Sequence, residues 1–388
     1  MSQRIPRNLI YADAIVDYRG VLASPGAIFI EGETLVDAGT PEAIGSIEGV
    51  SVTQINGVVT PSFVNTHSHL DLSGVGNEPP RDSFIDWFFE VIKPIRLDAD
   101  GIQAAVHKGI DLSLKGGCRI VGDIAGTQLA AEIVESSDLL PVSFIELFGL
   151  GEKQEAAIET LQLIPETFEV SPHAPYSCGK ELYQASFRSG KKVATHLSES
   201  LSEIEYTKFQ TGEFDSVLKL LGAWDETIEP WGGHPIDALL AVADGVPFLA
   251  AHVNYIEEHH LQMLADSNIT VAYCPRASEY FGHCEHRYIS MLDAGVRVSL
   301  GTDSLLCLDT PDRISVIDDL RYLYKRDHTD PLQLLTMGTV NGAIGLGLHP
   351  NLVTLDPGET AGLLVFESIV GDPIADIMKS EKMPDWLF

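Results

Sequence analysis

Short apolar runs alternate with longer amphipathic stretches through the central part of the chain. Eight of these runs are rich in Val, Ile, Leu and Ala and carry few charges, which is typical of parallel strands buried on both faces. The pattern predicts strands at residues 58–66, 119–124, 141–148, 168–171, 192–196, 247–253, 269–274 and 297–302. Helical patterns lie between them, for example at residues 154–163, 180–188, 256–266 and 286–294.

This regular alternation predicts an α/β fold. Strand–helix–strand units form right-handed crossovers and generate a parallel sheet. Eight such units over about 290 residues favour a closed (β/α)₈ barrel, the TIM barrel, over an open sheet. We therefore expect residues 58–349 to form a barrel whose functional side chains stand at the carboxyl ends of its strands.

The two chain ends have a different pattern. Residues 1–57 contain short alternating runs at 8–16, 26–31 and 33–38 that are separated by Gly and Pro, as in antiparallel strands joined by hairpins. The segment PGETAGLLVFES near the carboxyl end has the same character. We expect residues 1–57 and 350–388 to form a small β-sandwich domain together.

The composition limits the classes of molecule that the protein can bind. The chain has 388 residues, of which 45% are hydrophobic, and its 25 Lys+Arg against 56 Asp+Glu give a net charge of −31. The apolar content is that of a globular protein. The acidic balance and the lack of Lys/Arg runs oppose binding to nucleic acid and to anionic membranes. We expect a small-molecule partner, and a homodimer is compatible with this type of barrel.

Cysteine usage and hydropathy indicate the compartment. Five scattered cysteines form no CxxC motif, so reduced thiols fit better than a disulfide framework. The first residues lack the apolar region of a secretory signal, and no apolar stretch approaches 18 residues. We therefore expect a cytoplasmic protein without a membrane span.

The sequence Asn65-Thr-His67-Ser-His69 ends the first predicted strand. Residues i and i+2 of a strand point to the same side, so both imidazoles can reach one metal ion. A pair of histidines with this spacing is common by chance, but further polar residues also follow predicted strands. They are His173 after the fourth, His196 in the fifth, His252 in the sixth and Asp303 after the eighth. Barrel strand ends converge, so this set predicts a metal-dependent active site.

The motifs PSFVNTHSH, ATHLSE, AHVNY and LGTDS together resemble the amidohydrolase superfamily, in its mononuclear deaminase and chlorohydrolase branch. The resemblance covers nearly the whole chain. It implies that His67, His69, His196 and Asp303 are the metal ligands. It also implies that Glu199 is a general acid/base and that His252 holds the attacking water or the product oxygen, while Asp303 accepts a proton from that water.

The resemblance also bears on the number of metal ions. Binuclear relatives resemble one another in a carboxylated lysine after the fourth strand, where this chain has His173 and Ala174. One divalent ion is therefore expected. Zinc is preferred, although three imidazoles and a carboxylate also suit iron.

Three residues are candidates for substrate contact. In similar deaminases the histidine of the segment SPHAPYSCG binds substrate, which points to His173. Arg276 follows the seventh predicted strand and would hold an anionic group, or form a salt bridge. Trp87, in an aromatic run at residues 83–94, would wall the pocket against water or pack a helix onto the barrel.

The predicted function is hydrolytic deamination of a purine-like or adenosine-derived substrate with release of ammonia. The AHVNY and CPR segments look most like aminodeoxyfutalosine deaminases, and the HxxE motif is similar to S-adenosylhomocysteine deaminases. A triazine-type chlorohydrolase or a cyclic amide hydrolase is the first alternative. A non-catalytic metal-binding scaffold is the second, and the presence of Glu199 argues against both.

Overall fold

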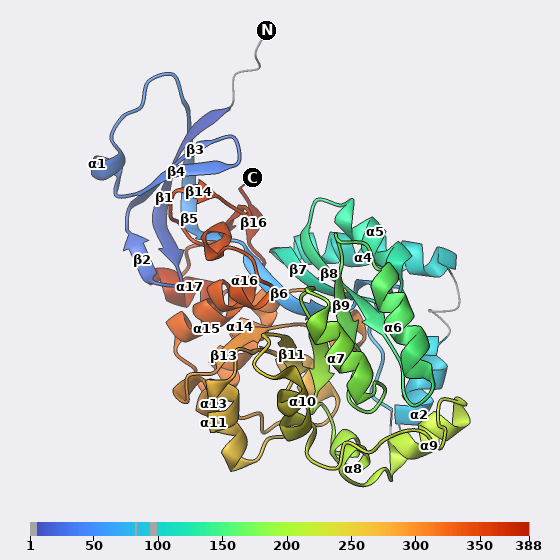
Figure 1. Ribbon diagram of the computed structural model, residues 1–388. Helices are drawn as coiled ribbons and strands as arrows, with labels where there is room; N and C mark the ends of the chain where they lie inside the picture. The colour runs from blue at the N-terminus through green and yellow to red at the C-terminus, as the bar shows by residue number, and fades with distance from the viewer. Residues whose placement is uncertain (1–5, 82–83, 94–98, 388) are drawn as a thin grey trace.

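The computed structural model describes residues 6–81, 84–93 and 99–387. Figure 1 shows a large body of strands and helices, from which a smaller group of strands projects. The projecting group is coloured blue and red, so both ends of the chain contribute to it (Figure 1).

Eight central strands form two parallel four-stranded sheets. The first sheet contains, in order, β6 (Phe63–Ser68), β7 (Cys118–Ala125), β8 (Leu140–Leu147) and β9 (Glu169–Pro172). The second contains β10 (Ala194–Leu197), β11 (Leu249–His252), β12 (Thr270–Tyr273) and β13 (Arg297–Leu300). Each of the eight predicted strands overlaps one of these, so the parallel α/β prediction is confirmed.

The two sheets are hydrogen-bonded to each other at both edges. Between β9 and β10, the Val170 amide donates to the Lys192 carbonyl at 3.2 Å. Between β13 and β6, the amides of Thr302 and Asp303 both donate to the His67 carbonyl at 3.0 Å. The end of the last strand therefore lies directly beside the end of the first.

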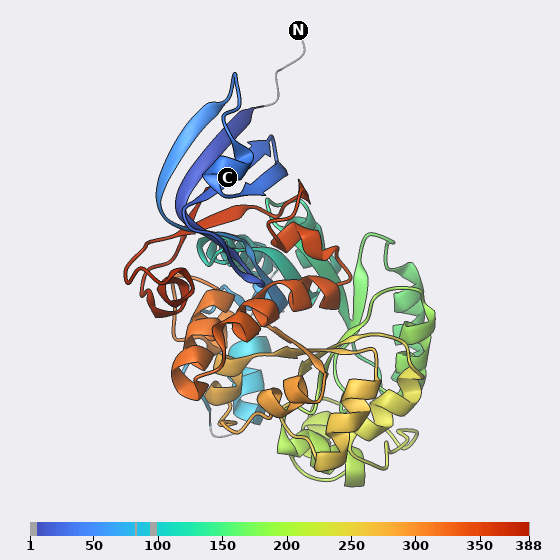
Figure 2. The same ribbon diagram turned by 90° about the vertical axis from the view of Figure 1, so that its left-hand side faces the viewer.

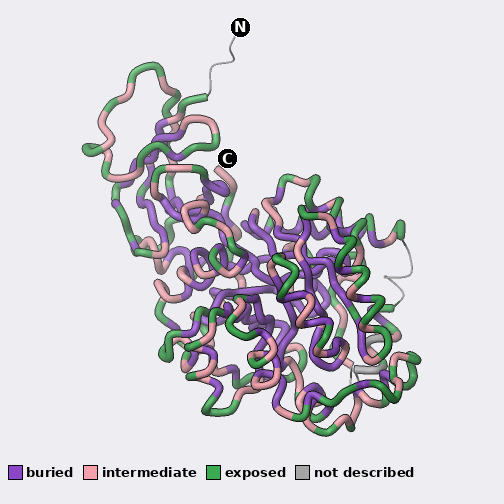
Figure 3. Tube along the Cα trace, viewed as in Figure 1, coloured by how far each residue is buried: buried purple, intermediate pink, exposed green. Residues whose placement is uncertain are grey.

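The strands are buried on both faces, as Figure 3 shows by their purple colour. Within β7, for example, Ile120 and Ile124 join an inner apolar cluster, whereas Val121 and Ala125 join the larger cluster under the helices. This period of two explains why the sequence shows continuous apolar runs here. The polar residues at the strand ends are the exceptions to this apolar pattern.

Helices follow the strands and cover the outer face of the sheets (Figure 2). After β7 to β11 they are α5 (Gln128–Glu135), α6 (Lys153–Leu163), α7 (Lys180–Arg188), α8 (Leu201–Phe209), α9 (Glu213–Leu220), α10 (Pro235–Ala243) and α11 (Glu258–Asp266). After β12 and β13 they are α12 (Pro275–Tyr280), α13 (Tyr288–Asp293), η3 (Leu305–Cys307), α14 (Val316–Asp327), α15 (Pro331–Gly338) and α16 (Val340–Gly345). Between β6 and β7 lie η1 (Leu70–Leu72), α2 (Phe84–Trp87), η2 (Phe88–Ile92) and α4 (Ala99–Lys115).

One sheet joins both chain ends. Its strands are β1 (Arg7–Asp17), β2 (Gly20–Ala23), β3 (Gly26–Glu31), β4 (Thr34–Gly39), β5 (Ser51–Pro61), β14 (Gly358–Glu359), β15 (Leu363–Phe366) and β16 (Asp385–Trp386). The short helices of the two ends are α1 (Pro41–Ile44), η4 (Pro350–Val353) and α17 (Pro373–Lys379). β1 pairs antiparallel with β3 but parallel with β5. The expectation of purely antiparallel strands in this region is therefore wrong for one pair.

The first predicted strand, at residues 58–66, corresponds to two strands. β5 ends at Pro61 and belongs to the terminal sheet, and β6 begins at Phe63 in the central sheet. Ser62 alone separates them, and its amide donates to the Gly362 carbonyl at 3.0 Å. The apolar run is continuous because both strands are buried, which hides the change of sheet. Among the described helices, none has the length and apolar character needed to cross a membrane.

Candidate metal centre and active site

Five predicted site residues lie together at the carboxyl ends of the central strands. His67 is in β6, His196 in β10 and His252 at the end of β11. His69 directly follows β6, and Asp303 comes shortly after β13. Each of these side chains is at least nine-tenths buried. Parallel strands that start on one side bring their ends to the same side, which is why residues so distant in sequence meet here.

The ligand atoms of this cluster lie close to one another. His69 Nε2 lies 3.2 Å from His196 Nε2 and 3.7 Å from Asp303 Oδ1. The His67 ring centroid is 5.1 Å from that of His69 and 4.9 Å from that of His196. Two nitrogens that each lie about 2.1 Å from a tetrahedral zinc ion are roughly 3.4 Å apart. The spacing of the histidines therefore fits a metal centre.

The hydrogen-bond pattern of His67 and His252 also fits a cation. Both ring nitrogens of His67 and Nε2 of His252 are buried and have no hydrogen-bond partner. Burial together with the neighbouring imidazoles holds the pKa of His67 well below its usual value. Burial also lowers the pKa of His252 to about 4. Both rings are thus neutral near pH 7, which is the form that binds a metal.

Backbone contacts orient two of the proposed ligands. His196 Nδ1 donates to the His173 carbonyl at 2.9 Å, which leaves Nε2 with its lone pair toward the cluster. One carboxylate oxygen of Asp303 accepts from the Ser304 amide at 2.7 Å. Asp303 has φ 59°, in the left-handed region that a residue with a side chain rarely occupies. Such strained positions concentrate at functional sites.

His252 also has a left-handed backbone, with φ 68°. Leu249 faces the inner apolar cluster and Ala250 the outer one, so strict alternation would turn His252 outward. The changed φ breaks this alternation, and the His252 ring stacks on that of His196 with centroids 5.4 Å apart. His286 Nε2 donates to the His252 carbonyl at 2.9 Å and supports this conformation.

Glu199 lies beside the cluster rather than within it. Its Oε1 is 3.6 Å from His252 Nε2, and ligand atoms of Glu199, His252 and Asp303 lie within 4.8 Å of one another. The Glu199 side chain is 24% exposed, whereas that of His252 is 1% exposed. Burial raises the pKa of the Glu199 and Asp303 carboxyls. Glu199 can therefore hold a proton at higher pH than an exposed glutamate and still reach the solvent-facing side.

His173 lies next to the cluster, as its candidate role requires. Its ring centroid is 4.8 Å from that of His196, and its Nδ1 is 2.7 Å from Ser177 Oγ. Two neighbours were missed by the sequence interpretation. Glu146 Oε1 lies 3.9 Å from His173 Nε2, and the half-exposed Phe148 stacks on the His173 ring at 4.8 Å. A glutamate inside an otherwise apolar strand end was the signal that could have found Glu146.

Trp87 and Arg276 have different surroundings. Trp87 packs against an apolar cluster that includes Leu72, Cys274 and Leu306, which follow the ends of β6, β12 and β13. Arg276 is 7% exposed and its guanidinium contacts Asp319 at 2.9 Å. It also donates to the Ser315 carbonyl and to the side chains of Asp309 and Thr310. Of the two alternatives for Arg276, the structure shows the salt bridge, in a buried form.

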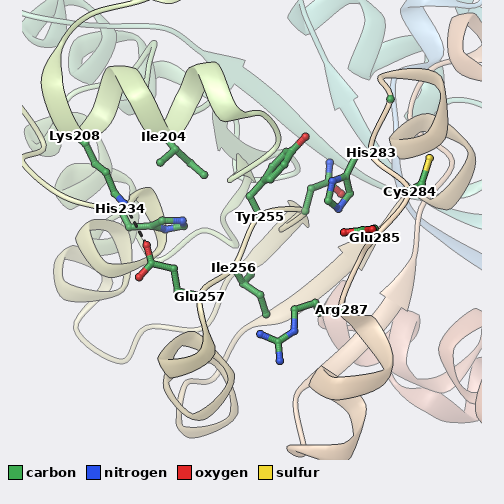
Figure 4. Close-up of a pocket in the computed structure, with 12 residues that line it drawn as sticks. Ile204, Lys208, His234, Tyr255, Ile256, Glu257, His283, Cys284, Glu285 and Arg287 are labelled. Carbon is green, nitrogen blue, oxygen red and sulfur yellow. Dashed lines mark hydrogen bonds and ion pairs between the residues drawn. The ribbon is translucent and has the colours of Figure 1, made fainter.

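Figure 4 shows a pocket of about 600 Å³ that is separate from the set of proposed metal ligands. Its walls come from α8 and from the segments that follow β11 and β12, and they include Lys208, Tyr255, His283 and Arg287. Lys208 is paired with Glu257 at 3.2 Å, and Arg287 with Glu258 at 2.8 Å. Neither the proposed metal ligands nor Glu199 line this pocket, and two of its cations are already paired with carboxylates.

A second His/Asp group lies between α10 and α11, where Asp237 and His259 are partly exposed and His260 is buried. Asp237 Oδ1 is 3.1 Å from His259 Nε2 and 3.2 Å from His260 Nε2. His260 Nδ1 accepts from the Glu257 amide at 2.8 Å, so the His260 proton is on Nε2. That nitrogen donates to Asp237 and has no lone pair for a metal. This group is a helix cap and not a second metal centre.

Known proteins resemble this chain over most of its length. A 5-methylthioadenosine/S-adenosylhomocysteine deaminase of Syntrophomonas wolfei is 25% identical over 363 residues, covering 88% of this chain and 80% of the relative. A 5'-deoxyadenosine deaminase of Methanothermobacter thermautotrophicus is 24% identical over 388 residues, covering 93% and 84%.

Solved structures show the same fold. Helicobacter pylori aminofutalosine deaminase in complex with methylthio-coformycin superposes with a TM-score of 0.80 at 21% identity, covering 97% of both chains. An adenosine deaminase from Xanthomonas campestris with bound zinc gives a TM-score of 0.73 at 15% identity, covering 96% of this chain and 89% of the other. The family profile of the amidohydrolases matches residues 58–385. The resemblance inferred from the sequence motifs is thereby confirmed, and the chain belongs to the amidohydrolase family.

Proposed function

We propose that this protein is a metal-dependent aminohydrolase that replaces the exocyclic amine of an adenosine-derived nucleoside with oxygen and releases ammonia. The position of Glu199 carries the proposal, because its carboxyl lies 3.6 Å from a neutral His252 at the solvent-facing side of the histidine cluster. The relatives named above are deaminases of adenosine derivatives, which supports the same class of enzyme.

His67, His69, His196 and Asp303 would hold one divalent cation. Zinc is proposed because three imidazoles and a carboxylate suit it, and a protein of the same fold carries zinc. Iron would suit the same donors. When bound, such an ion supplies a nucleophilic water at neutral pH by lowering its pKa.

Side chains of the protein would then transfer the protons of the reaction. Asp303 accepts one proton from the attacking water. Glu199 delivers a proton to the ring nitrogen next to the reacting carbon. It then takes the proton of the added hydroxyl group and passes it to the amine, which departs as ammonia. The proton held by Asp303 finally returns to Glu199, so that both water protons end in the products. His252 is neutral and its Nε2 lies 3.6 Å from Glu199 Oε1, where it can hold the oxygen that adds to the ring. One water is consumed, and one C–N bond is exchanged for one C–O bond.

We assign substrate contact to His173 and Trp87. His173 lies beside the proposed ligand His196 and is stacked with Phe148, which presents an aromatic face to a flat ring. Trp87 covers the segments that follow three of the strands, so it can exclude water from the pocket. Arg276 is left out of this set, because its guanidinium is already paired with Asp319.

We also propose an architecture around this site. The eight central strands would form one closed (β/α)₈ barrel over residues 58–349, because both edges of the two sheets are hydrogen-bonded to each other. Residues 1–57 and 350–388 would form a small β-sandwich domain with its own apolar core, which includes Ile10, Ile28 and Leu363. The five cysteines are all free thiols, which is compatible with a cytoplasmic enzyme.

The triazine-type hydrolase is the second candidate, since triazine hydrolase variants share this fold with a TM-score of 0.77 at 18% identity. An amine leaving group must be protonated, whereas chloride need not be, and Glu199 beside the cluster supplies that proton. Retention of this carboxyl therefore favours deamination over dechlorination.

The test uses the zinc-loaded protein and a panel of adenosine, 5'-deoxyadenosine, 5'-methylthioadenosine, S-adenosylhomocysteine and aminodeoxyfutalosine. Ammonia release and the shift of the purine absorbance are followed together. We expect turnover of at least one nucleoside, and a loss of about 10²–10⁴-fold in kcat for Glu199→Gln with the metal retained. A protein that leaves the whole panel unchanged, or a Glu199→Gln variant with full turnover, would contradict the proposal.

A further inference from the structure

The backbone amide of Glu199 is hydrogen-bonded to the buried side chain of Glu203. The Glu199 amide donates to Glu203 Oε2 at 2.8 Å, and the Ser198 amide donates to Glu203 Oε1 at the same distance. Glu203 lies in the first turn of α8 and is completely buried. Both oxygens of the Glu203 side chain therefore accept hydrogen bonds from the two residues that follow β10. One of these residues is Glu199, the proposed proton donor.

The backbone of Glu199 is also held at its carbonyl group. Asn254 Nδ2 donates to the Glu199 carbonyl at 3.0 Å, and Asn254 Oδ1 accepts from Ser278 Oγ at 2.8 Å. Asn254 is 3% exposed and Ser278 is 1% exposed. Groups from α8, from the segment after β11 and from α12 thus fix the two peptide groups that flank the α-carbon of Glu199.

The turn that needs this support is strained. Ser198 has φ 52°, in the left-handed region, although it carries a side chain. This conformation redirects the chain immediately after β10, so that Glu199 emerges beside His252. Two hydrogen bonds from adjacent amides to one carboxylate are the kind of contact that keeps such a turn in a single conformation.

Capping of the first turn of α8 does not explain the hydrogen bonds of Glu203. Ser200 is the N-cap, and its Oγ accepts from the Glu203 amide at 3.2 Å. In a capping box the carboxylate of the third helical residue returns to the amide of the N-cap residue itself. Here its hydrogen bonds reach past Ser200 to Ser198 and Glu199. Burial raises the pKa of Glu203 to about 8, and the amide hydrogen bonds oppose this rise.

We propose that Glu203 is a positioning residue, which sets the direction of the Glu199 side chain through the Ser198 and Glu199 amides and thereby controls proton delivery to the substrate. This inference rests on the proposed function, because it gives Glu203 a task only if Glu199 transfers protons. It predicts that the loss of Glu203 lowers kcat and leaves substrate binding nearly unchanged.

The first test compares two equivalent substitutions in the same helix. Glu203→Gln keeps the size of the side chain but turns an amino group toward a backbone amide, whereas Glu205→Gln alters an exposed residue of α8. On the nucleoside that the wild-type protein deaminates, we expect Glu203→Gln to lower kcat about 10- to 100-fold with KM changed less than about threefold, since small displacements of a catalytic group cost this much. Glu205→Gln should keep the wild-type kcat.

The second test asks whether Glu203 acts through Glu199. If it does, adding Glu203→Gln to a Glu199→Gln protein should reduce the residual kcat less than about threefold, because the group that it positions is already gone. A general structural defect would instead multiply the two losses. Thermal unfolding of each variant checks that the fold is intact, and Glu203→Asp, which is too short to reach both amides, is measured if Glu203→Gln does not fold.

The outcomes separate this inference from the proposed function. An active wild-type protein whose Glu203→Gln and Glu203→Asp variants retain kcat, or whose double variant shows multiplied losses, overturns the role of Glu203 alone. A wild-type protein that deaminates none of the nucleosides overturns the proposed function and this role with it. A selective loss of kcat that disappears in the Glu199→Gln background supports the inference.

Discussion

Asn65 and Thr302 exchange two hydrogen bonds between the first and the last central strand. Asn65 Nδ2 donates to Thr302 Oγ1 at 2.8 Å, and the Thr302 amide donates to Asn65 Oδ1 at 3.1 Å. Both residues are almost completely buried. They directly precede the segments that carry His67 and Asp303, so this pair sets the distance between two of the proposed ligands.

Removal of the Asn65 amide should weaken both the fold and the metal site. For Asn65→Ala we expect the free energy of unfolding to fall by about 2–3 kcal/mol, because buried partners in Thr302 lose their hydrogen bonds. Metal affinity should fall roughly 10-fold, as is usual when a group that orients the ligands is lost. Urea denaturation and competition with a zinc indicator measure the two effects.

A matched control for this change is Asn268→Ala, because the Asn268 side chain donates only to the Gly245 carbonyl on the exposed surface. That variant should lose less than about 0.5 kcal/mol. Equal stability of Asn65→Ala and Asn268→Ala would contradict a role of the Asn65–Thr302 pair.

Substitution of one proposed ligand should remove the metal, whereas substitution of its neighbour should not. His69→Asn is expected to reduce the bound zinc from about one ion per chain to a small fraction, because three donors remain and one of the close nitrogens is gone. His173→Asn should keep its zinc and raise KM, since the hydrogen bond that orients His196 comes from the His173 backbone carbonyl and survives the substitution. Elemental analysis after gel filtration decides between them, and a zinc-replete His69→Asn protein would refute the ligand assignment.

The buried pair of Arg276 and Asp319 yields a prediction about stability. Arg276→Met leaves the Asp319 carboxylate, which is 0% exposed, without its partner, and the free energy of unfolding should fall by about 3–5 kcal/mol. Replacing Asp319 by Leu in the same protein should restore much of this loss. Arg287→Met, which breaks an exposed pair with Glu258, should cost less than about 1 kcal/mol.

Kinetics of Arg276→Met provide the counter-test. If Arg276 bound an anionic group of the substrate, the variant would show a KM raised tenfold or more with unchanged stability. That result would reinstate the role first inferred from the sequence.

The stability of the metal-free protein should fall as the pH drops from about 6.5 towards 4. Burial lowers the pKa of His286 to about 3, whereas a histidine in the unfolded chain titrates near 6.5. Between these values the unfolded state binds more protons, so protonation favours unfolding. Between pH 6.5 and 4 one such contribution is worth about 3 kcal/mol. Urea denaturation at several pH values in the presence of a chelator measures the slope.

Replacement of His286 should flatten this dependence. His286→Gln can still donate to the His252 carbonyl but cannot take up a proton, so the slope between pH 4.5 and 6 should decrease by about 1.4 kcal/mol per pH unit. His107→Gln, at an exposed position of α4, should leave the slope as it is. An unchanged slope in His286→Gln would show that other groups cause the acid sensitivity.

Local patterns predicted the strands well, because a strand buried on both faces leaves an apolar run that does not depend on its partners. The predicted strand 269–274, for example, contains β12, Thr270–Tyr273. The division at Ser62 was not predictable, because it depends on pairing with Gly362 far along the chain. For the same reason the parallel pairing of β1 with β5 could not be inferred from the alternation of either strand.

In the candidate site, too, local patterns were predictable and contacts between distant segments were not. The meeting of His67, His196 and His252 was predictable, since each histidine ends a strand and strand ends converge. The contacts of Glu203 and His286 were not, because they depend on the turns at Ser198 and His252. The prediction that Arg276 binds an anionic group was misleading for a related reason. Its partner Asp319 lies in a helix far along the chain, and no sequence pattern indicated that the two residues would meet.

The joining of the first and last central strands has a consequence for biosynthesis. A nascent chain that has left the ribosome as far as β12 already contains His67, His69 and His196, but it has neither Asp303 nor the strand that fixes His67 through Thr302. Such a chain offers exposed imidazoles without the geometry of the finished centre. With the proposed ligand set, tight metal loading would await release of the last strand, and the bound ion would mark chains whose synthesis has passed that point.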